Sequence, residues 1–315
     1  MNYKRFISEQ IEALKRDVGD AIAINALSGG VDSSVVTVLA HKALGTRLKT
    51  ILVDNAIMRE GEPDRVVKVF KGMGIPVELI DARKQFLRAL KGLTDPEEKR
   101  RAITETFYRD VFAKAVKQSK ATFLLHGTIL TDIEETVAGI KRQHNILAQI
   151  GIDPQKTYGY KVLEPLATLR KDGVRRVASL LGLPENITSR IPFPGPALAT
   201  RIVGEVTQTR LDTVRKATAI VEEELKETGA FQYLAVLLND CATGIRRGRR
   251  EFGQIIVVRC IDSVDARKAT VRELPWKTLN RITRRITAIP GVNRCLYDLT
   301  PKPPEIGRAS CRERV

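Results

Sequence analysis

The chain has 315 residues, of which 43% are hydrophobic, and this is enough for two domains with a core each. Its formal net charge of +16 suits a protein whose ligands are polyanions, either nucleic acid or phosphorylated small molecules. Aromatic residues make up only 5%, which argues against a stacking surface for single-stranded RNA. No apolar run is as long as the ~18 residues that span a membrane, and the N-terminus has no apolar signal region. We therefore expect a cytoplasmic protein.

Apolar spacing predicts a leading helix over residues 4–17. A short apolar and β-branched run then ends at Leu27, and the turn Ser28–Gly30 leads into a second apolar-periodic run. This order predicts a strand, a tight loop and a helix. Free backbone amides in such a loop, together with the positive end of the helix dipole, can bind a multiply charged phosphate.

Two better-known phosphate loops do not fit the stretch Ser28–Ser34, SGGVDSS. The GxxxxGK[ST] loop needs a lysine, and this stretch has none. The dinucleotide fingerprint GxGxxG needs three spaced glycines, whereas here two are adjacent and the third is absent. The stretch is similar instead to the pyrophosphate loop of the ATP pyrophosphatases, which split ATP between its α- and β-phosphates.

Strands and helices alternate through the first half of the chain, which predicts a parallel sheet. Asp54 and Asn55 follow one strand directly, so they should face the same crevice as the loop glycines. The predicted strands cover residues 48–53, 77–81, 121–125 and 163–169, and the predicted helices cover 63–72, 95–118, 131–141 and 170–183.

Asp132 and Glu135 are three residues apart and would share one side of the helix over 131–141. Beside a triphosphate such a pair could hold Mg²⁺ through oxygen ligands, although an acidic helix start explains them equally well. Residues 139–160 lose periodicity and are typical of a mobile lid or binding loop.

The first domain should end near Arg190, where a proline-rich connector over 190–201 begins. Beyond it the sequence predicts a small α+β domain. Its predicted helices cover residues 207–228 and 275–288, and its predicted strands cover 232–238, 254–261 and 293–299.

An ordered series of motifs from about residue 20 to Pro304 resembles the synthetase part of the glutamine-hydrolysing GMP synthetase family. The series continues after SGGVDSS with DPEEKR at 95–100, HGT…D..E at 126–135, IK..HN at 140–145, PFPGPALATR at 192–201, GEVT at 204–207, VNR..YD at 292–298 and TPKPP at 300–304. The implied fold is α/β: an adenine-nucleotide α-hydrolase-like parallel sheet domain of the N-type ATP pyrophosphatases (1–190), then a small α+β domain for XMP binding and dimerisation (191–304).

The resemblance implies a ligase that converts xanthosine monophosphate (XMP), ATP and ammonia into GMP, AMP and pyrophosphate through an adenylated intermediate. Its catalytic residues would be Asp32, Lys141 and His144, although a lone loop histidine can equally be a solvated bystander. Mg²⁺ would be held by Asp32, Asp132 and Glu135. XMP would be bound by Arg100 and Lys302. ATP would be bound by Ser28, Gly29, Gly30, Val31, Asp32, Ser33, Ser34, Val53, Asp54, Gly127 and Thr128.

Three features depart from the family pattern. Gln143 stands in place of a lid histidine, and Gly248 stands in place of an acidic residue. Residues 305–315, EIGRASCRERV, replace an ending close to ATIEWE, and their codons can be written as a common sequencing-library adapter. We therefore interpret 305–315 as a non-native tail, which the source nucleotides would test, and we expect it to raise the KM for XMP.

Because the sequence starts close to the loop, we expect no glutaminase domain ahead of it. We therefore expect the archaeal two-subunit arrangement, in which a separate glutaminase subunit supplies ammonia, and the resemblance also implies a homodimer. The main alternative is an ATP-pyrophosphatase-type enzyme that modifies tRNA, which the basic charge favours. The absence of a paired-cysteine sulfur relay and the presence of a second domain with the KPP motif argue against this alternative, so nucleic acid is not expected as a partner. A non-catalytic nucleotide-binding or RNA-binding module and an NAD synthetase, whose loop is similar, are weaker alternatives.

Overall fold

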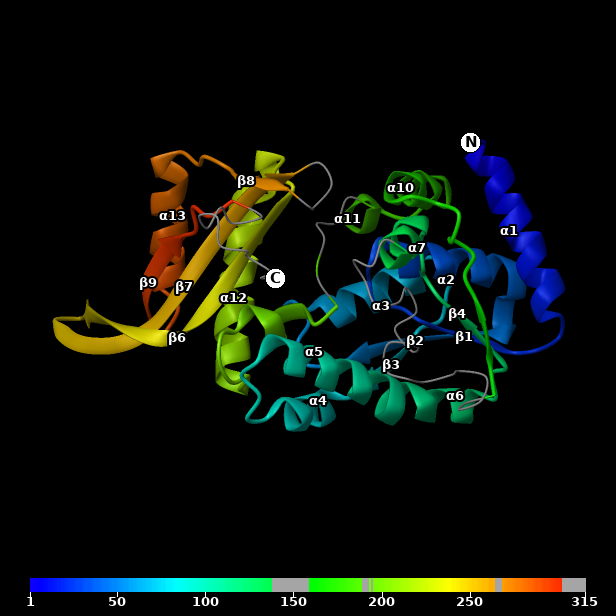
Figure 1. The fold of residues 1–315 in the computed structure, drawn as a ribbon, viewed down its shortest axis with the longest axis horizontal. Helices are drawn as coiled ribbons and strands as arrows, with labels where there is room; N and C mark the ends of the chain where they lie inside the picture. Colours follow the sequence, from blue (N-terminus) through cyan, green and yellow to red (C-terminus); the bar gives the residue numbers. More distant parts are fainter. Residues whose placement is uncertain (138–158, 189–192, 194, 264–267, 302–315) are drawn as a thin grey trace. The chain divides into compact units, whose positions relative to one another are not determined.

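The computed structural model describes residues 1–137, 159–188, 193, 195–263 and 268–301. The chain separates into two compact units (Figure 1), Met1–Ala89 with Arg101–Arg190, and Leu90–Arg100 with Ile191–Val315. The second unit thus includes Leu90–Arg100, a segment that lies within the predicted first domain. No helix in the described ranges is both long and apolar enough to cross a membrane.

The first unit is built on a five-stranded sheet in the order β3-β2-β1-β4-β5. Every pair of neighbouring strands is parallel, as the alternation of strands and helices predicts. The strands are β1 (Ala23–Ala26), β2 (Leu48–Asp54), β3 (Glu78–Asp81), β4 (Phe123–Leu125) and β5 (Lys161–Leu163).

Helices lie on both sides of this sheet (Figure 1). They are α1 (Tyr3–Val18), α2 (Val31–Leu44), η1 (Gly45–Arg47), α3 (Glu62–Gly72), α4 (Arg83–Leu90), α5 (Pro96–Glu105), the π-helical η2 (Thr106–Phe112), α6 (Ala113–Ser119), α7 (Leu130–Val137), α10 (Lys171–Leu180) and α11 (Glu185–Thr188).

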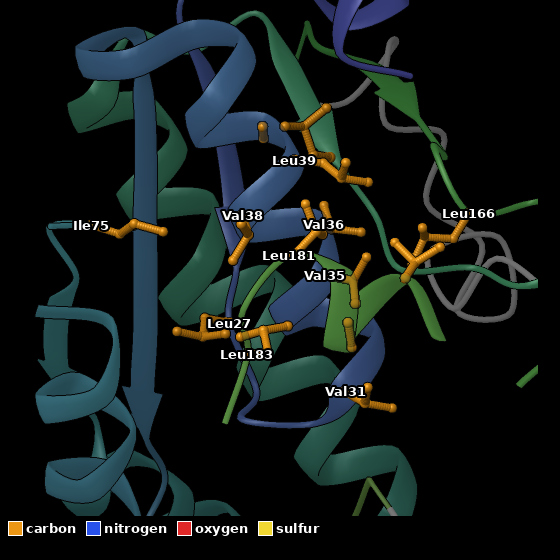
Figure 2. Packing of buried hydrophobic residues seen from close by; sticks show 14 of the residues in the cluster. Leu27, Val31, Val35, Val36, Val38, Leu39, Ile75, Leu166, Leu181 and Leu183 are labelled. Carbon is orange, nitrogen blue, oxygen red and sulfur yellow. The ribbon is translucent and has the colours of Figure 1, made fainter. Parts of the chain in front are cut away.

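The core of the first unit surrounds α2. This helix is apolar on nearly all sides, because it packs against β1 and β2 as well as against α1, α10 and α11. Figure 2 shows Val35, Val36 and Leu39 of α2 among leucines from distant segments, including Leu166 and Leu181. Since α2 is held from several directions, its first turn is a rigid support for the loop that precedes it.

Two predictions for the first unit differ from the structure, and the prediction also lacks a helix. The last strand is Lys161–Leu163 rather than 163–169, since Pro165 has no amide for the sheet and the chain turns after Glu164. The single helix predicted over 95–118 is three consecutive segments with a π-helical one in the middle. The short helix α4 is not predicted from the sequence. The predicted loop over 139–160 lies outside the described residues except for Gly159 and Tyr160.

The second unit is an α+β structure, as predicted, with a four-stranded sheet. Its strands are β6 (Gln232–Arg246), β7 (Arg249–Ser263), β8 (Ala269–Val271) and β9 (Val292–Tyr297). Its helices are η3 (Ala197–Arg201), α12 (Gln208–Leu225), η4 (Lys226–Thr228) and α13 (Trp276–Thr287). Strands β6 and β8 pair with β7 antiparallel, whereas β9 pairs with β7 parallel.

Among the described residues, helices cover one face of the second sheet and leave the other face partly exposed, and we call the latter the open face. Helix α12 contacts β6 and β7, and α13 contacts β9. Ala235, Leu237 and Ile256 are fully buried, so their face is the one that the helices cover. Across the opposite face, Val236, Val257 and Leu296 pair in register and stay partly exposed.

The predicted strands over 232–238 and 254–261 are much too short. β6 and β7 form one long hairpin that turns at Arg247 and Gly248, both with positive φ. The strand β8 is also missing from the prediction. Because the turn end of the hairpin is exposed, its sequence is polar and arginine-rich and lacks the apolar alternation that marks a half-buried strand.

Candidate active site

The loop Ser28–Ser34 leaves the first sheet at its carboxyl edge. Ala26 of β1 pairs with Ile51 of β2, and the Leu27 amide donates to the Ile51 carbonyl over 2.8 Å. The loop therefore starts beside the carboxyl end of β2, as predicted for a parallel sheet. Gly29 has φ +74°, a conformation that favours glycine, and its turn reverses the chain into α2.

Serine hydroxyls hold the loop in one shape. Ser28 Oγ lies 2.9 Å from Ser33 Oγ, and Ser33 Oγ donates to the Gly30 carbonyl over 3.1 Å. Two successive hydrogen bonds support these hydroxyls. Asn25 Nδ2 donates to Thr37 Oγ1 over 2.6 Å, and Thr37 Oγ1 donates to the Ser33 carbonyl over 2.8 Å. This network ties β1 to α2 across the loop, so the loop is shaped before any ligand arrives.

The first turn of α2 presents amide groups without acceptors. Gly30 is the N-cap and provides no side-chain cap. The amides of Val31, Asp32 and Ser33 have no acceptor among the residues that the structure describes. Three such amides at the positive end of a 14-residue helix form an anion site, which is the chemistry that the sequence predicts for this loop.

Asp32 lies in this turn with its two oxygens in different surroundings. Oδ2 pairs with the ammonium of Lys171, which begins α10, over 2.6 Å. Oδ1 is buried and has no hydrogen-bond partner in the described part of the chain. A buried carboxylate oxygen without a donor fits a metal ion as its ligand.

Gly127 approaches the same turn from the strand on the other side of β1. A Cβ atom at this position would lie 3.3 Å from the Ser33 nitrogen, so only glycine allows this contact without displacement. The next residue, Thr128, is buried and donates to Glu164 Oε1 over 2.6 Å. The predicted pair Gly127 and Thr128 is thus fixed beside the loop.

The other predicted residues for ATP and metal stand as follows. Val53 is buried, and Asp54 uses Oδ1 to accept the Ala56 amide over 3.0 Å. Asp132 accepts the Ile129 amide over 3.1 Å at the start of α7, which is the ordinary role of an acidic helix start. Within the described residues no group of three or more His, Cys, Asp and Glu could hold a metal ion. The side chain of Glu135 lies outside the described residues.

Arg100 stands on α5 in the second unit, where its half-exposed side chain lies 3.5 Å from Glu97. Lys141, His144, Gln143 and Lys302 lie outside the described residues. Sequence reasoning misses Lys171. The sequence does hold a signal that could have identified Lys171. A helix that follows a strand of a parallel sheet begins at the carboxyl edge of the sheet, where the loop Ser28–Ser34 also lies, and Lys171 begins such a helix.

Comparison with known proteins divides the chain in a consistent way. Residues 3–202 match the family model "NAD synthase", and residues 218–306 match "GMP synthase C terminal domain". The first match covers the domain with the Ser28–Ser34 loop, and the second separates the chain from enzymes that share only this loop.

Archaeal relatives match over nearly their full length. Each is named as one subunit of the glutamine-hydrolysing GMP synthase. The protein of Methanocella arvoryzae is 49% identical over 95% of this chain and 96% of its own length. The protein of Archaeoglobus fulgidus is 48% identical over 96% of this chain and 98% of its own length. The protein of Methanopyrus kandleri is 45% identical over 96% of this chain and 97% of its own length. With such identity over both units, the chain belongs to the family of these archaeal GMP synthase subunits, an ATP-using ligase family that contains the synthetase part of the enzyme.

Proposed function

We propose that the chain makes GMP from XMP, ATP and ammonia, with AMP and pyrophosphate as the other products. In the first step O2 of xanthine attacks the α-phosphorus, and the bond from this phosphorus to the bridging oxygen breaks, which releases pyrophosphate. Ammonia then attacks C2, and the bond from C2 to O2 breaks, which releases AMP. No covalent protein nucleophile is needed.

The observation that carries the proposal is the set of three amides without acceptors at the start of α2, with Asp32 and Lys171 beside them. Amides and an ammonium stabilise the charge that develops as pyrophosphate leaves. We assign the β- and γ-phosphates to Ser28, Gly29, Gly30, Val31, Asp32, Ser33 and Ser34. We assign the adenosine to Val53, Asp54, Gly127 and Thr128.

The remaining assignments follow the family motifs. Lys141 and His144 would contact the phosphates, and Arg100 and Lys302 would bind XMP. Asp32, together with Asp132 and Glu135, would hold Mg²⁺, and the unpartnered Asp32 Oδ1 fits this role. A bound Mg²⁺ would neutralise charge on the departing pyrophosphate.

We also propose two protein partners. The relatives are named as one subunit of an enzyme, which implies another, and we infer that the other is a glutaminase that supplies ammonia. For the second unit we propose self-association through the open sheet face around Leu296, which is 47% exposed.

The test supplies the chain with ATP, Mg²⁺, ammonium and XMP and follows pyrophosphate, AMP and GMP. We expect all three products in equal amounts, and no GMP when glutamine replaces ammonium. A parallel reaction contains tRNA in place of XMP. Pyrophosphate release with tRNA but not with XMP, from this chain and from a version ending ATIEWE, would overturn the proposal in favour of a tRNA-modifying enzyme.

A further inference from the structure

Lys99 is a buried cation in the second unit. Its side chain is 1% exposed, and Nζ donates to the Ile202 carbonyl over 2.7 Å and to the Gly204 carbonyl over 2.5 Å. Burial and, to a lesser extent, the charge of nearby Arg210 lower the pKa of Lys99 to about 8, although Asp95 opposes the shift. No ion pair links Lys99 to a carboxylate in the described ranges. Burying a charged group without an opposite charge costs free energy. The two hydrogen bonds from Nζ therefore hold the structure in a way that an apolar side chain could not.

The loop that accepts these bonds is held by a second cation from α12. Arg210 donates to the Val203 carbonyl over 2.8 Å and to the Glu205 carbonyl over 2.9 Å. Four successive carbonyls, 202 to 205, therefore accept alternately from Lys99 and Arg210. Gly204 has φ +88° and little space for a Cβ, so this loop conformation depends on glycine.

The segment Leu90–Arg100 is fastened to the same loop at another point. Glu205 Oε1 accepts the Gly92 amide over 2.8 Å. At the start of α5, Asp95 Oδ1 accepts the amides of Glu97 and Glu98, each over 2.9 Å. Glu205 thus holds the beginning of the segment, and Lys99 holds its end.

We propose that Lys99 is a positioning residue for XMP, because it fixes the rotation of α5 that presents Arg100. Adjacent helical residues are about 100° apart around the axis, so the burial of Lys99 turns Arg100 toward solvent, where its side chain is 50% exposed. This inference rests on the proposed function, in which Arg100 binds XMP. Glu205 acts in the same way through Gly92.

The variants Lys99→Met and Glu205→Ala test the proposal by steady-state kinetics on the full chain. Each should raise the KM for XMP about tenfold and leave the KM for ATP and the kcat at saturating XMP within about twofold. Lys99→Arg, which keeps the charge and the donors, should recover part of the loss. Arg101→Met removes an exposed neighbouring cation and serves as the matched control, with an unchanged KM for XMP.

Glu205→Ala also separates positioning from simple electrostatics. Removing a negative charge near an anion site lowers the KM for XMP if only charge matters, whereas loss of the Gly92 contact raises it. The proposal is wrong if Glu205→Ala leaves the KM for XMP unchanged or lower, whether or not Lys99→Met folds. It is equally wrong if the KM for ATP rises as much. Absence of XMP-dependent turnover in the parent chain would instead contradict the proposed function.

Discussion

Lys171 is the residue whose change tests the phosphate site most directly. Its ammonium lies 2.6 Å from Asp32 beside the amides of α2, where it can stabilise the departing pyrophosphate. We expect Lys171→Met to lower the kcat for XMP-dependent pyrophosphate release at least tenfold and Lys171→Arg to retain more activity.

Lys161→Met is the matched control for this prediction. Lys161 is exposed at the other end of β5, away from the edge where the loop lies, so its loss should change the kcat less than twofold. Equal activities for Lys171→Met and Lys161→Met would show that the Lys171–Asp32 pair is only a surface contact.

At the residue scale, sequence reasoning locates a site more reliably than it locates bonds. Ser28, Asp32 and Gly127 converge as the order of parallel strands predicts. The pairing of Asp32 with Lys171 is not predictable in the same way, since 139 positions separate the two residues and their contact depends on how α10 packs against α2. The five charged residues over 97–101 are typical of a solvated helix face, yet Lys99 is buried. Its burial is not predictable from the sequence, because one buried charge among five leaves no local pattern.

At the element scale, the pairing of α12 with α13 depends on ionised carboxylates. Glu224, with a side chain only 6% exposed, bonds to Arg281 and, over 2.8 Å, to Arg285, which also bonds to Glu223 over 2.6 Å. Burial raises the pKa of Glu224, but the bonds from Arg285 and Arg281 outweigh burial and hold this pKa below its ordinary value.

A carboxyl group whose pKa is lower in the folded than in the unfolded state stabilises the fold when it is ionised. The stabilisation is complete above the ordinary glutamate pKa of about 4.5 and disappears as the pH falls through the lowered value. We expect Glu224→Gln to cost about 1–2 kcal/mol at pH 7, seen as a lower midpoint of thermal unfolding, because both arginines remain partly exposed. The difference from the parent chain should shrink below about pH 4.

Glu227→Gln is the control for this pH dependence. Its side chain is 87% exposed and pairs only loosely with Lys226, over 3.7 Å, so the unfolding midpoint should stay within about a degree of the parent at every pH. An unchanged midpoint for Glu224→Gln at pH 7 would mean that apolar packing alone holds α12 against α13.

Elements with one buried face are predictable from this sequence, and elements without one are not. The helix α12 begins after Thr207, whose side chain caps it, and its helical run ends at Gly229 with φ +67°, as predicted. The far end of the β6–β7 hairpin escapes prediction because Ile245 and Phe252, 81% and 74% exposed, stand among arginines without an alternating pattern. β8 has only three residues, too few for any period to be seen.

At the scale of the whole molecule, the two-domain organisation follows from length and from the change in element order, but the membership of Leu90–Arg100 does not. This segment lies between two stretches of the first unit in the sequence, yet it belongs to the second unit, to which Gly92 and Lys99 bond. Contacts between residues about 100 positions apart leave no periodic trace in a single sequence.

The proposed self-association gives a prediction about the mass of the molecule in solution. Leu296 lies beside Val257 on the open face of the second sheet, and burying this face against a second copy would remove its apolar area from water. A glutamate in the middle of such an interface would be desolvated without a partner. We therefore expect sedimentation to give about twice the 35.1 kDa of one chain for the parent protein and a single-chain mass for Leu296→Glu. Leu180→Glu, at a leucine of the first unit with nearly the same exposure, 48%, should keep the doubled mass. A parent chain that sediments as a monomer, or a doubled mass that survives Leu296→Glu, would show that this face does not hold two copies together.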